Sequence, residues 1–112
     1  MMYSQVTIFH VPLGGMAELR RLIQEEYLPA IYTRPGFIGA YLLEQVDDPD
    51  TAQMVQLWDN HASVENLSRT GLLETSIQML AARLPGLRMV RQGYVVRLAT
   101  SGVSEAASVA TR

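Results

Sequence analysis

Two side chains stand out as candidates for catalysis in this sequence of 112 residues. His10 is a candidate general base, because histidine titrates near neutral pH. The alternative is a strand-end histidine that bonds a neighbouring carbonyl. Trp58, the only tryptophan, either stacks against a planar substrate ring or fills the core with its indole N–H on one acceptor. We take His10 and Trp58 as the candidate catalytic residues and leave both structural alternatives open.

Five further residues are candidates for binding a substrate. A tyrosine hydroxyl can donate to a substrate oxyanion, although tyrosines more often lie in cores and interfaces. Methionine offers an adaptable apolar surface, and the second histidine either overhangs a pocket or is simply exposed. The candidates are Tyr27, Tyr41, Met54, Tyr94 and His61. In addition, Arg91 and Arg97 share one strand face, where they could hold an acidic substrate, pair with Glu44 or be solvated.

The composition excludes several kinds of chemistry. The chain has no cysteine and no lysine, since all nine basic residues are arginine. Thiolate nucleophiles, zinc–cysteine sites, Schiff bases and a phosphate-loop lysine are therefore excluded. The two histidines lack the spacing of metal ligands. The net charge of −2 predicts no basic face for nucleic acid. No apolar run approaches the roughly 20 residues of a membrane span. We expect a soluble, cytoplasmic domain without a metal or other cofactor.

Hydrophobic periodicity divides the chain into the elements that must position these residues. Alternating residues predict strands over 3–12, 37–46, 53–58 and 88–98. A period of three to four predicts an amphipathic helix over 16–33, disturbed near Pro29. Two more helical pieces are predicted, one near 61–68, capped by Asp59 or Asn60, and one from Thr70 or Gly71 to Leu84.

The order β-α-β-β-α-β predicts a ferredoxin-like α+β fold. In this fold an antiparallel four-stranded sheet carries both helices on one face. We expect the domain to span residues 1–98. Residues 99–112 are small and polar, and they predict a flexible C-terminal tail, because such a segment buries too little apolar surface to offset the entropy of ordering it.

Apolar residues on both faces of the expected sheet require a second cover. In the second strand, Phe37 is predicted to share a face with Tyr41, and Ile38 lies on the opposite, equally apolar face. The fourth strand presents one row formed by Val90, Tyr94, Val96 and Leu98. Two helices cover only one face, and monomers rarely leave large apolar patches exposed. We therefore expect a homodimer in which two sheets pack face to face; the alternative is an open sheet with a groove for another partner.

A series of short motifs between Val6 and Leu98 carries a family resemblance. They are the opening strand VTIFHV, the helix end at Leu28-Pro29, the break and strand PGFIGA at 35–40, the loop DDP at 47–49, and the strand end LWD at 57–59. In this order and spacing, the chain resembles the antibiotic biosynthesis monooxygenase (ABM) superfamily of dimeric α+β barrels. The Pro-Gly-Phe element and the tryptophan that closes the third strand are the most specific parts.

The resemblance can be followed into subgroups of the superfamily. Haem-degrading members carry an axial histidine on the helix after the tryptophan, and the corresponding residues 67–69 include none. Anthrone-oxidising members carry an asparagine four residues before the tryptophan and a tyrosine six residues after it. Those positions hold Met54 and Val64 here, so Trp58 alone matches that pattern.

The function that the resemblance implies is cofactor-independent oxygenation of a hydrophobic aromatic or quinol-type molecule. The substrate must lose a proton, and the resulting electron-rich anion then passes an electron to dioxygen. Such a reaction needs a base, a donor that holds the anion and a dry apolar cavity. One alternative is a non-catalytic dimeric barrel that binds a small ligand or a partner protein, for example in a stress response. The other is an isomerase or cyclase of the same fold.

Overall fold

Four antiparallel strands form a single sheet in the computed structural model of the protein, which describes residues 1–100. They are β1 (Tyr3–His10), β2 (Phe37–Glu44), β3 (Thr51–Trp58) and β4 (Arg88–Val95). The spatial order is β2-β3-β1-β4, so the first and third strands are central. All four predicted strands are present, with β4 ending three residues earlier than expected. Residues 101–112 of the predicted tail lie outside the described residues.

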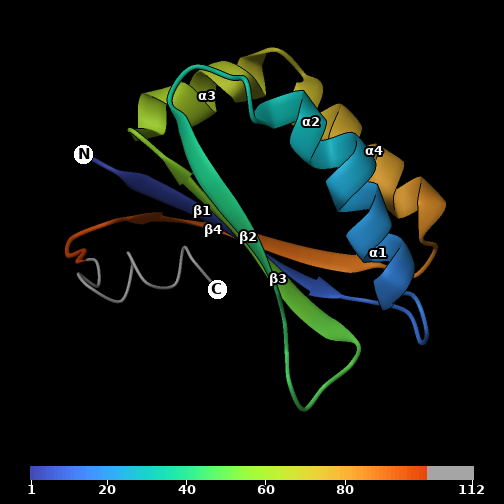
Figure 1. The fold of residues 1–112 in the computed structure, drawn as a ribbon. Helices are drawn as coiled ribbons and strands as arrows, with labels where there is room; N and C mark the ends of the chain where they lie inside the picture. The colour runs from blue at the N-terminus through green and yellow to red at the C-terminus, as the bar shows by residue number, and fades with distance from the viewer. Residues whose placement is uncertain (101–112) are drawn as a thin grey trace, which may run out of the picture.

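All helices lie on one side of this sheet (Figure 1). The first helical segment runs without a break through α1 (Met16–Leu22), η1 (Ile23–Tyr27) and α2 (Leu28–Ile31). The second helical segment consists of α3 (His61–Arg69) and α4 (Leu72–Arg83). Asn60 caps α3, because its side-chain oxygen accepts from the backbone N–H of Ser63 at 3.0 Å. The predicted ferredoxin-like α+β order is therefore confirmed.

The predicted disturbance near Pro29 takes the form of a π-helical turn. Proline lacks a backbone N–H, and its ring clashes with the carbonyl four residues earlier. The turn before it is wider than an α-turn: the N–H of Leu28 donates to the carbonyl of Ile23, five residues back. Such π-turns often occur at functional sites. This one ends at Tyr27, which is buried between the helices and the sheet.

The core of the molecule lies between the helices and the sheet. The helices contribute an apolar stripe, and the strands contribute the residues whose side chains alternate toward the helices. Each fully buried aliphatic or aromatic side chain stabilises the fold by roughly 1.5–3 kcal/mol. The largest fully buried side chains are Trp58, Phe9, Leu19, Leu22, Ile23, Ile31, Met54 and Leu80.

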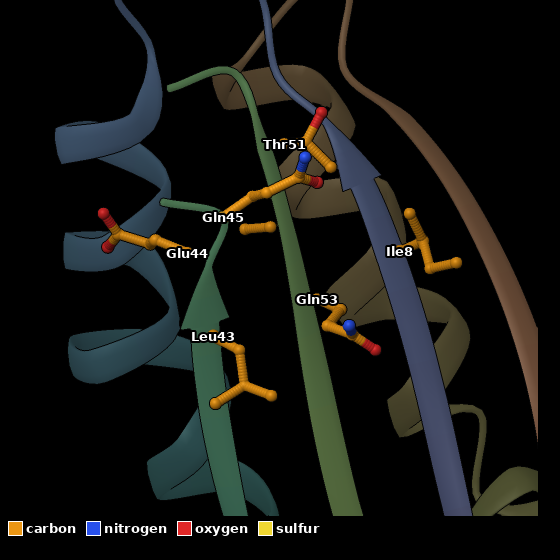
Figure 2. Close-up of a pocket in the computed structure, with 7 residues that line it drawn as sticks. Ile8, Leu43, Glu44, Gln45, Thr51 and Gln53 are labelled. Atoms are coloured by element: carbon orange, nitrogen blue, oxygen red, sulfur yellow. The ribbon is translucent and has the colours of Figure 1, made fainter. Parts of the chain in front are cut away.

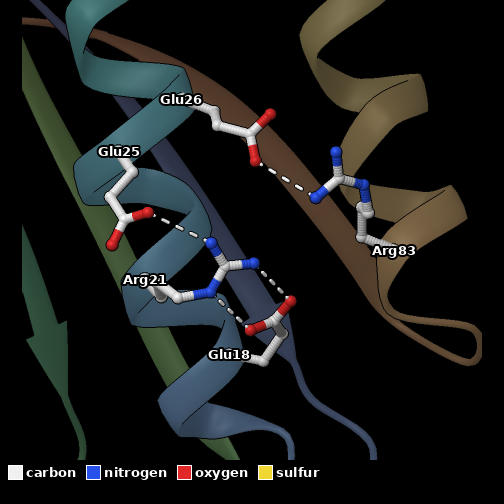
Figure 3. Close-up of polar contacts among 5 residues, drawn as sticks. All are labelled: Glu18, Arg21, Glu25, Glu26 and Arg83. Carbon is white, nitrogen blue, oxygen red and sulfur yellow. Dashed lines mark hydrogen bonds and ion pairs between the residues drawn. The ribbon is translucent and has the colours of Figure 1, made fainter.

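Charged side chains on the solvent side of the first helix connect it to α4 (Figure 3). Arg21 donates two hydrogen bonds of 2.8 Å to Glu18 and one of 3.1 Å to Glu25. Arg83 of α4 donates to Glu26 at 3.2 Å. The hydrogen bond from Arg21 holds the pKa of Glu18 below its ordinary value. The pairs of Arg21 lie within the first helix, and the Arg83–Glu26 pair joins it to α4. Because all of these pairs are largely solvent-exposed, each contributes little to the stability of the fold.

A β-bulge makes the predicted facing of Phe37 wrong. The pairing of β2 with β3 shifts by one residue between Phe37 and Gly39, so Ile38 is an inserted residue. Phe37 consequently lies on the helix side, where its ring packs edge-on against Trp58 with centroids 5.1 Å apart. Tyr41 remains on the opposite face. Simple alternation cannot anticipate such an inserted residue.

The sheet face opposite the helices, called the outer face below, exposes apolar side chains. The exposed large hydrophobic residues on it are Ile8, Tyr41, Leu43, Val90 and Tyr94. Leu43, Gln53, Ile8 and Val90 form one row across all four strands, and Figure 2 shows the first three around a hollow of about 210 Å³. The row predicted for the last strand is present for Val90 and Tyr94, while Val96 and Leu98 lie beyond the end of β4.

Candidate active site

A stripe of polar side chains crosses the helix-facing side of the sheet. Gln56 of β3 and Gln5 and Thr7 of β1 are all buried there. The pairing of β1 with β3 sets Gln56 opposite Gln5, and the pairing of β1 with β4 sets Arg91 beside Thr7. Buried polar groups cost free energy unless they are hydrogen-bonded. The stripe is therefore organised around specific hydrogen bonds.

A chain of two hydrogen bonds links Trp58 to Tyr27. The indole Nε1–H of Trp58 donates to Oε1 of Gln56 at 3.0 Å, and Nε2 of Gln56 donates to the Tyr27 hydroxyl oxygen at 2.8 Å. The indole N–H is only a donor, so it fixes which end of the amide faces it. Nε2 must then face Tyr27, whose oxygen accepts. The hydroxyl hydrogen of Tyr27 is left to point toward another acceptor.

The environment of Tyr27 keeps its hydroxyl protonated at neutral pH. The side chain is 4% exposed. Burial raises the pKa of Tyr27, and this effect exceeds the opposing influence of the Gln56 hydrogen bond and of the positive charge on Arg91. Tyr27 is therefore a neutral hydrogen-bond donor.

Tyr27 borders a small space between the helices and the sheet. This inner hollow has a volume of about 10 Å³, close to that of one water. Its polar lining is Thr7, Tyr27 and Arg91, and the rest is apolar, including Met54 and Ile77. A larger space of about 340 Å³, called the α4 groove below, is lined by Ser68, Leu73, Glu74, Ile77 and Arg91. Because Ile77 and Arg91 line both spaces, the two adjoin.

Three of the predicted site residues come together here. Tyr27 and Met54 line the inner hollow, and Trp58 is connected to it through Gln56. Trp58 itself is 0% exposed, so it cannot stack on a ligand in this conformation. Its position matches the structural alternative, a core residue with its N–H on one acceptor, and it acts on the cavity by orienting Gln56.

The structure does not bring His10 to this cavity. The residue that pairs with Trp58 is Tyr3, at the start of β1, whereas His10 ends the strand and pairs with Thr51. Its side chain alternates onto the outer face, opposite the helices. Tyr41 and Tyr94 also lie on the outer face.

His61 lies at the start of α3, outside the inner hollow and the α4 groove. Its ring packs on that of Tyr3 with centroids 4.6 Å apart. Its Nδ1 lies 3.2 Å from a carboxylate oxygen of Glu65, one helical turn further on. These contacts agree with the alternative that His61 is an exposed first-turn residue.

Sequence reasoning missed Gln56 as a cavity residue, and for Arg91 it left open whether the side chain holds an acidic substrate, pairs with Glu44 or is solvated. Gln56 precedes Trp58 by two positions, so alternation already set both on one face. A polar residue at a core-facing strand position is the signal that was available. For Arg91, the suggested partner Glu44 instead accepts two hydrogen bonds from Arg20, at 2.7 and 2.9 Å.

The donor set of the cavity does not suit a histidine-ligated haem or a metal cluster. Haem iron is commonly held by an axial histidine, and neither His10 nor His61 lines the inner hollow or the α4 groove. Across residues 1–100, no group of three or more histidine, aspartate or glutamate side chains is arranged to hold a metal ion.

The sheet, the one-sided helices and the cavity between them define an α+β protein of the ferredoxin-like class. Within residues 1–100, no helix is both long and apolar enough to cross a membrane. The sequence matches no protein-family model and no curated protein.

Solved structures place the fold more closely. The chain is similar to SnoaB, a cofactor-independent oxygenase from Streptomyces nogalater, with 21% identity and a TM-score of 0.73 over 88% of this chain and 95% of that one. A Nitrosomonas europaea protein, provisionally assigned as an antibiotic biosynthesis monooxygenase, gives 14% identity and a TM-score of 0.68 over 86% and 99%. A heme-degrading protein from Mycobacterium tuberculosis gives 18% identity and a TM-score of 0.62, over 90% of this chain and 100% of that one. The chain has the fold of the antibiotic biosynthesis monooxygenases, as the resemblance implied.

Proposed function

We propose that the protein is a cofactor-independent monooxygenase of a hydrophobic aromatic or quinol-type molecule. The ligand binds in the α4 groove with its reacting oxygen directed toward Tyr27. The observation that carries this proposal is the hydrogen-bonded chain from Trp58 through Gln56, which leaves the Tyr27 hydroxyl as a donor at the inner hollow. The shared fold with a cofactor-independent oxygenase supports the same reaction class.

The chemistry follows from what the substrate must do. Loss of a proton leaves an electron-rich anion, which gives one electron to dioxygen, and the substrate radical and superoxide then combine through a new C–O bond. Cleavage of the O–O bond completes the reaction, in which a CH₂ group and O₂ become a carbonyl group and water. Tyr27 donates to the substrate oxygen on which negative charge develops. Gln56 and Trp58 are positioning residues that direct this donor.

Oxygen uptake with anthrone as the substrate tests the proposal. The wild-type protein should consume oxygen faster than a protein-free blank. Tyr27→Phe should lower the rate by about tenfold or more, because loss of one oxyanion donor commonly costs about 10²–10³ in kcat. Tyr32→Phe removes an exposed hydroxyl near the end of the same helix and should leave the rate unchanged. Uptake equal to the blank with folded protein would contradict the proposal.

A non-catalytic ligand-binding protein is the second candidate. It is favoured by one observation: among the described residues, 1–100, no histidine, aspartate or glutamate lines the inner hollow that Tyr27 borders, and these are the most common general bases. In that case the anthrone assay shows binding without oxygen uptake. Binding is measured by the change in fluorescence of Trp58, the only tryptophan.

We also propose that two copies of the chain pack through their outer faces as a homodimer. Exposed Ile8, Leu43 and Val90 form one continuous row with Gln53, and such a patch is unusual on a monomer. The same face carries both a hollow and a protruding Tyr41, which is 62% exposed, so it offers the complementary features that an interface between identical faces needs.

The mass in solution tests this dimer. Light scattering after gel filtration should give twice the 12.5 kDa of the chain. Tyr41→Arg adds a charge to an exposed residue of the outer face and should shift the mass to 12.5 kDa, whereas Tyr32→Arg, on the helix side, should not. A wild-type mass of one chain would contradict the dimer.

A further inference from the structure

Arg91 occupies a distinctive position in the cavity. It extends from β4 on the helix-facing side, beside Thr7. It lines both the inner hollow and the α4 groove, and among the described residues it is the only basic side chain that lines either space. A cation therefore stands at the junction of the two spaces, where a groove-bound ligand would point toward Tyr27.

This cation has no acidic partner within residues 1–100. Arg20, Arg21, Arg69 and Arg83 all form ion pairs with glutamates, whereas Arg91 forms none in that part of the chain. Glu74 lines the α4 groove too, but the two charged groups do not come within ion-pair distance. Glu74 also does not line the inner hollow. The guanidinium is therefore available to an anion from outside.

Such a cation would serve the proposed reaction. The reaction requires an anionic substrate, yet among residues 1–100 no histidine or carboxylate lines the inner hollow, and Glu74 is the only carboxylate of that part of the chain that lines the α4 groove. A positive charge close to an acidic hydroxyl lowers its pKa, and a guanidinium binds an anionic oxygen through two parallel N–H donors. Arg91 is close enough to Tyr27 for its charge to oppose the rise in the pKa of that phenol.

We infer that Arg91 binds an anionic oxygen of the ligand, so that the cavity selects aromatic molecules with an acidic hydroxyl or carboxyl group and holds them in the ionised form. The inference rests on the proposed function, because it concerns the same cavity. On ionisation the O–H electron pair stays on the ligand oxygen, and the proton passes to solvent water. Arg91 then fixes the anion while Tyr27 donates to it.

Calorimetric titration with two ligands of the same shape tests the inference apart from any oxidation. The probes are 2-naphthoate, which is anionic, and 2-naphthamide, its neutral counterpart. The wild-type protein should bind the naphthoate about 10- to 100-fold more tightly, the range expected for charge-assisted hydrogen bonds, and added salt should reduce this preference.

Charge-neutralising variants assign the preference to one residue. Arg91→Gln should abolish it and retain naphthamide binding, which shows that the cavity is intact. Arg97→Gln removes the same charge from the segment after β4 and should retain the preference. Equal affinities in the wild type, a preference that survives Arg91→Gln, or no binding of either probe would overturn the inference.

Neither probe can be oxidised at a CH₂ group, so the outcomes remain separable. An Arg91-dependent preference without anthrone oxidation would contradict only the proposed function. Anthrone oxidation without the preference would contradict only the role of Arg91.

Discussion

Replacing Gln56 by glutamate tests whether this residue sets the direction of the Tyr27 hydroxyl. Gln56→Glu preserves the side-chain shape but exchanges the amide donor for a carboxyl oxygen. When ionised, the carboxylate accepts from both Trp58 and Tyr27, so the Tyr27 hydrogen turns away from the inner hollow. When protonated, its O–H donates to Tyr27 and the native pattern returns. The activity of the variant relative to wild type should therefore rise as the pH falls.

The structure sets the scale of the effect. Gln56 is 2% exposed, so burial raises the pKa of the introduced carboxyl above the ordinary glutamate value of about 4.3. Full burial can raise it by about 3–5 units, but the two accepted hydrogen bonds oppose this. A net rise of about two units corresponds to ~2.7 kcal/mol. This energy is a loss of stability of the variant relative to wild type. Because the folded-state pKa is raised, the loss is absent below about pH 4 and appears as the pH rises through the raised pKa.

Two measurements at about pH 5 and pH 8 check this expectation. Oxygen uptake gives the ratio of variant to wild-type rates, and urea unfolding followed by Trp58 fluorescence gives the stability difference. Gln78→Glu, on the exposed side of α4, is the matched control and should change neither quantity with pH. A rate ratio for Gln56→Glu that is the same at both pH values would refute the directed hydrogen bond.

Three further changes have defined outcomes. Ultraviolet titration should show one late-ionising phenol, because burial raises the pKa of Tyr27, and Tyr27→Phe should remove that late step; loss of an early step would contradict this. Gly93→Ala should destabilise the fold by about 1–3 kcal/mol, because the added Cβ would meet the Tyr3 hydroxyl. Urea unfolding measures the loss of stability, and in a Tyr3→Ala background the same Gly93→Ala change should cost less. Arg20→Gln should lower the urea midpoint of unfolding at pH 7 but not near pH 2. The Arg20 hydrogen bond depresses the pKa of Glu44, so the contribution of this pair to stability is lost as the pH falls through that pKa. Equal shifts of the midpoint at both pH values would argue against this contribution.

Local patterns were sufficient to predict the elements. Alternation and the three-to-four period located every strand and helix, and Asn60 acts as the predicted cap. The exception is Phe37, whose facing depends on one inserted residue, Ile38. A bulge leaves no periodic signal, because it changes the phase of a strand without changing its composition.

The candidate site was harder to predict because it depends on contacts between distant elements. Tyr27 and Gln56 are 29 residues apart, and Tyr27 ends the π-turn that precedes Pro29. His10 was favoured for its chemical type. Alternation grouped it with Val6 and Ile8, but only the structure shows that this face of β1 is the outer one. Residue type alone therefore selected His10, whereas the structure sets Tyr27, and not His10, at the inner hollow.

A crystal structure of the protein with bound 2-naphthoate tests the cavity itself most directly. The ring should occupy the α4 groove, with the carboxylate within hydrogen-bond distance of Arg91 and of the Tyr27 hydroxyl. A naphthoate bound in the hollow on the outer face, or bound in the groove with its carboxylate directed away from both residues, would contradict the account.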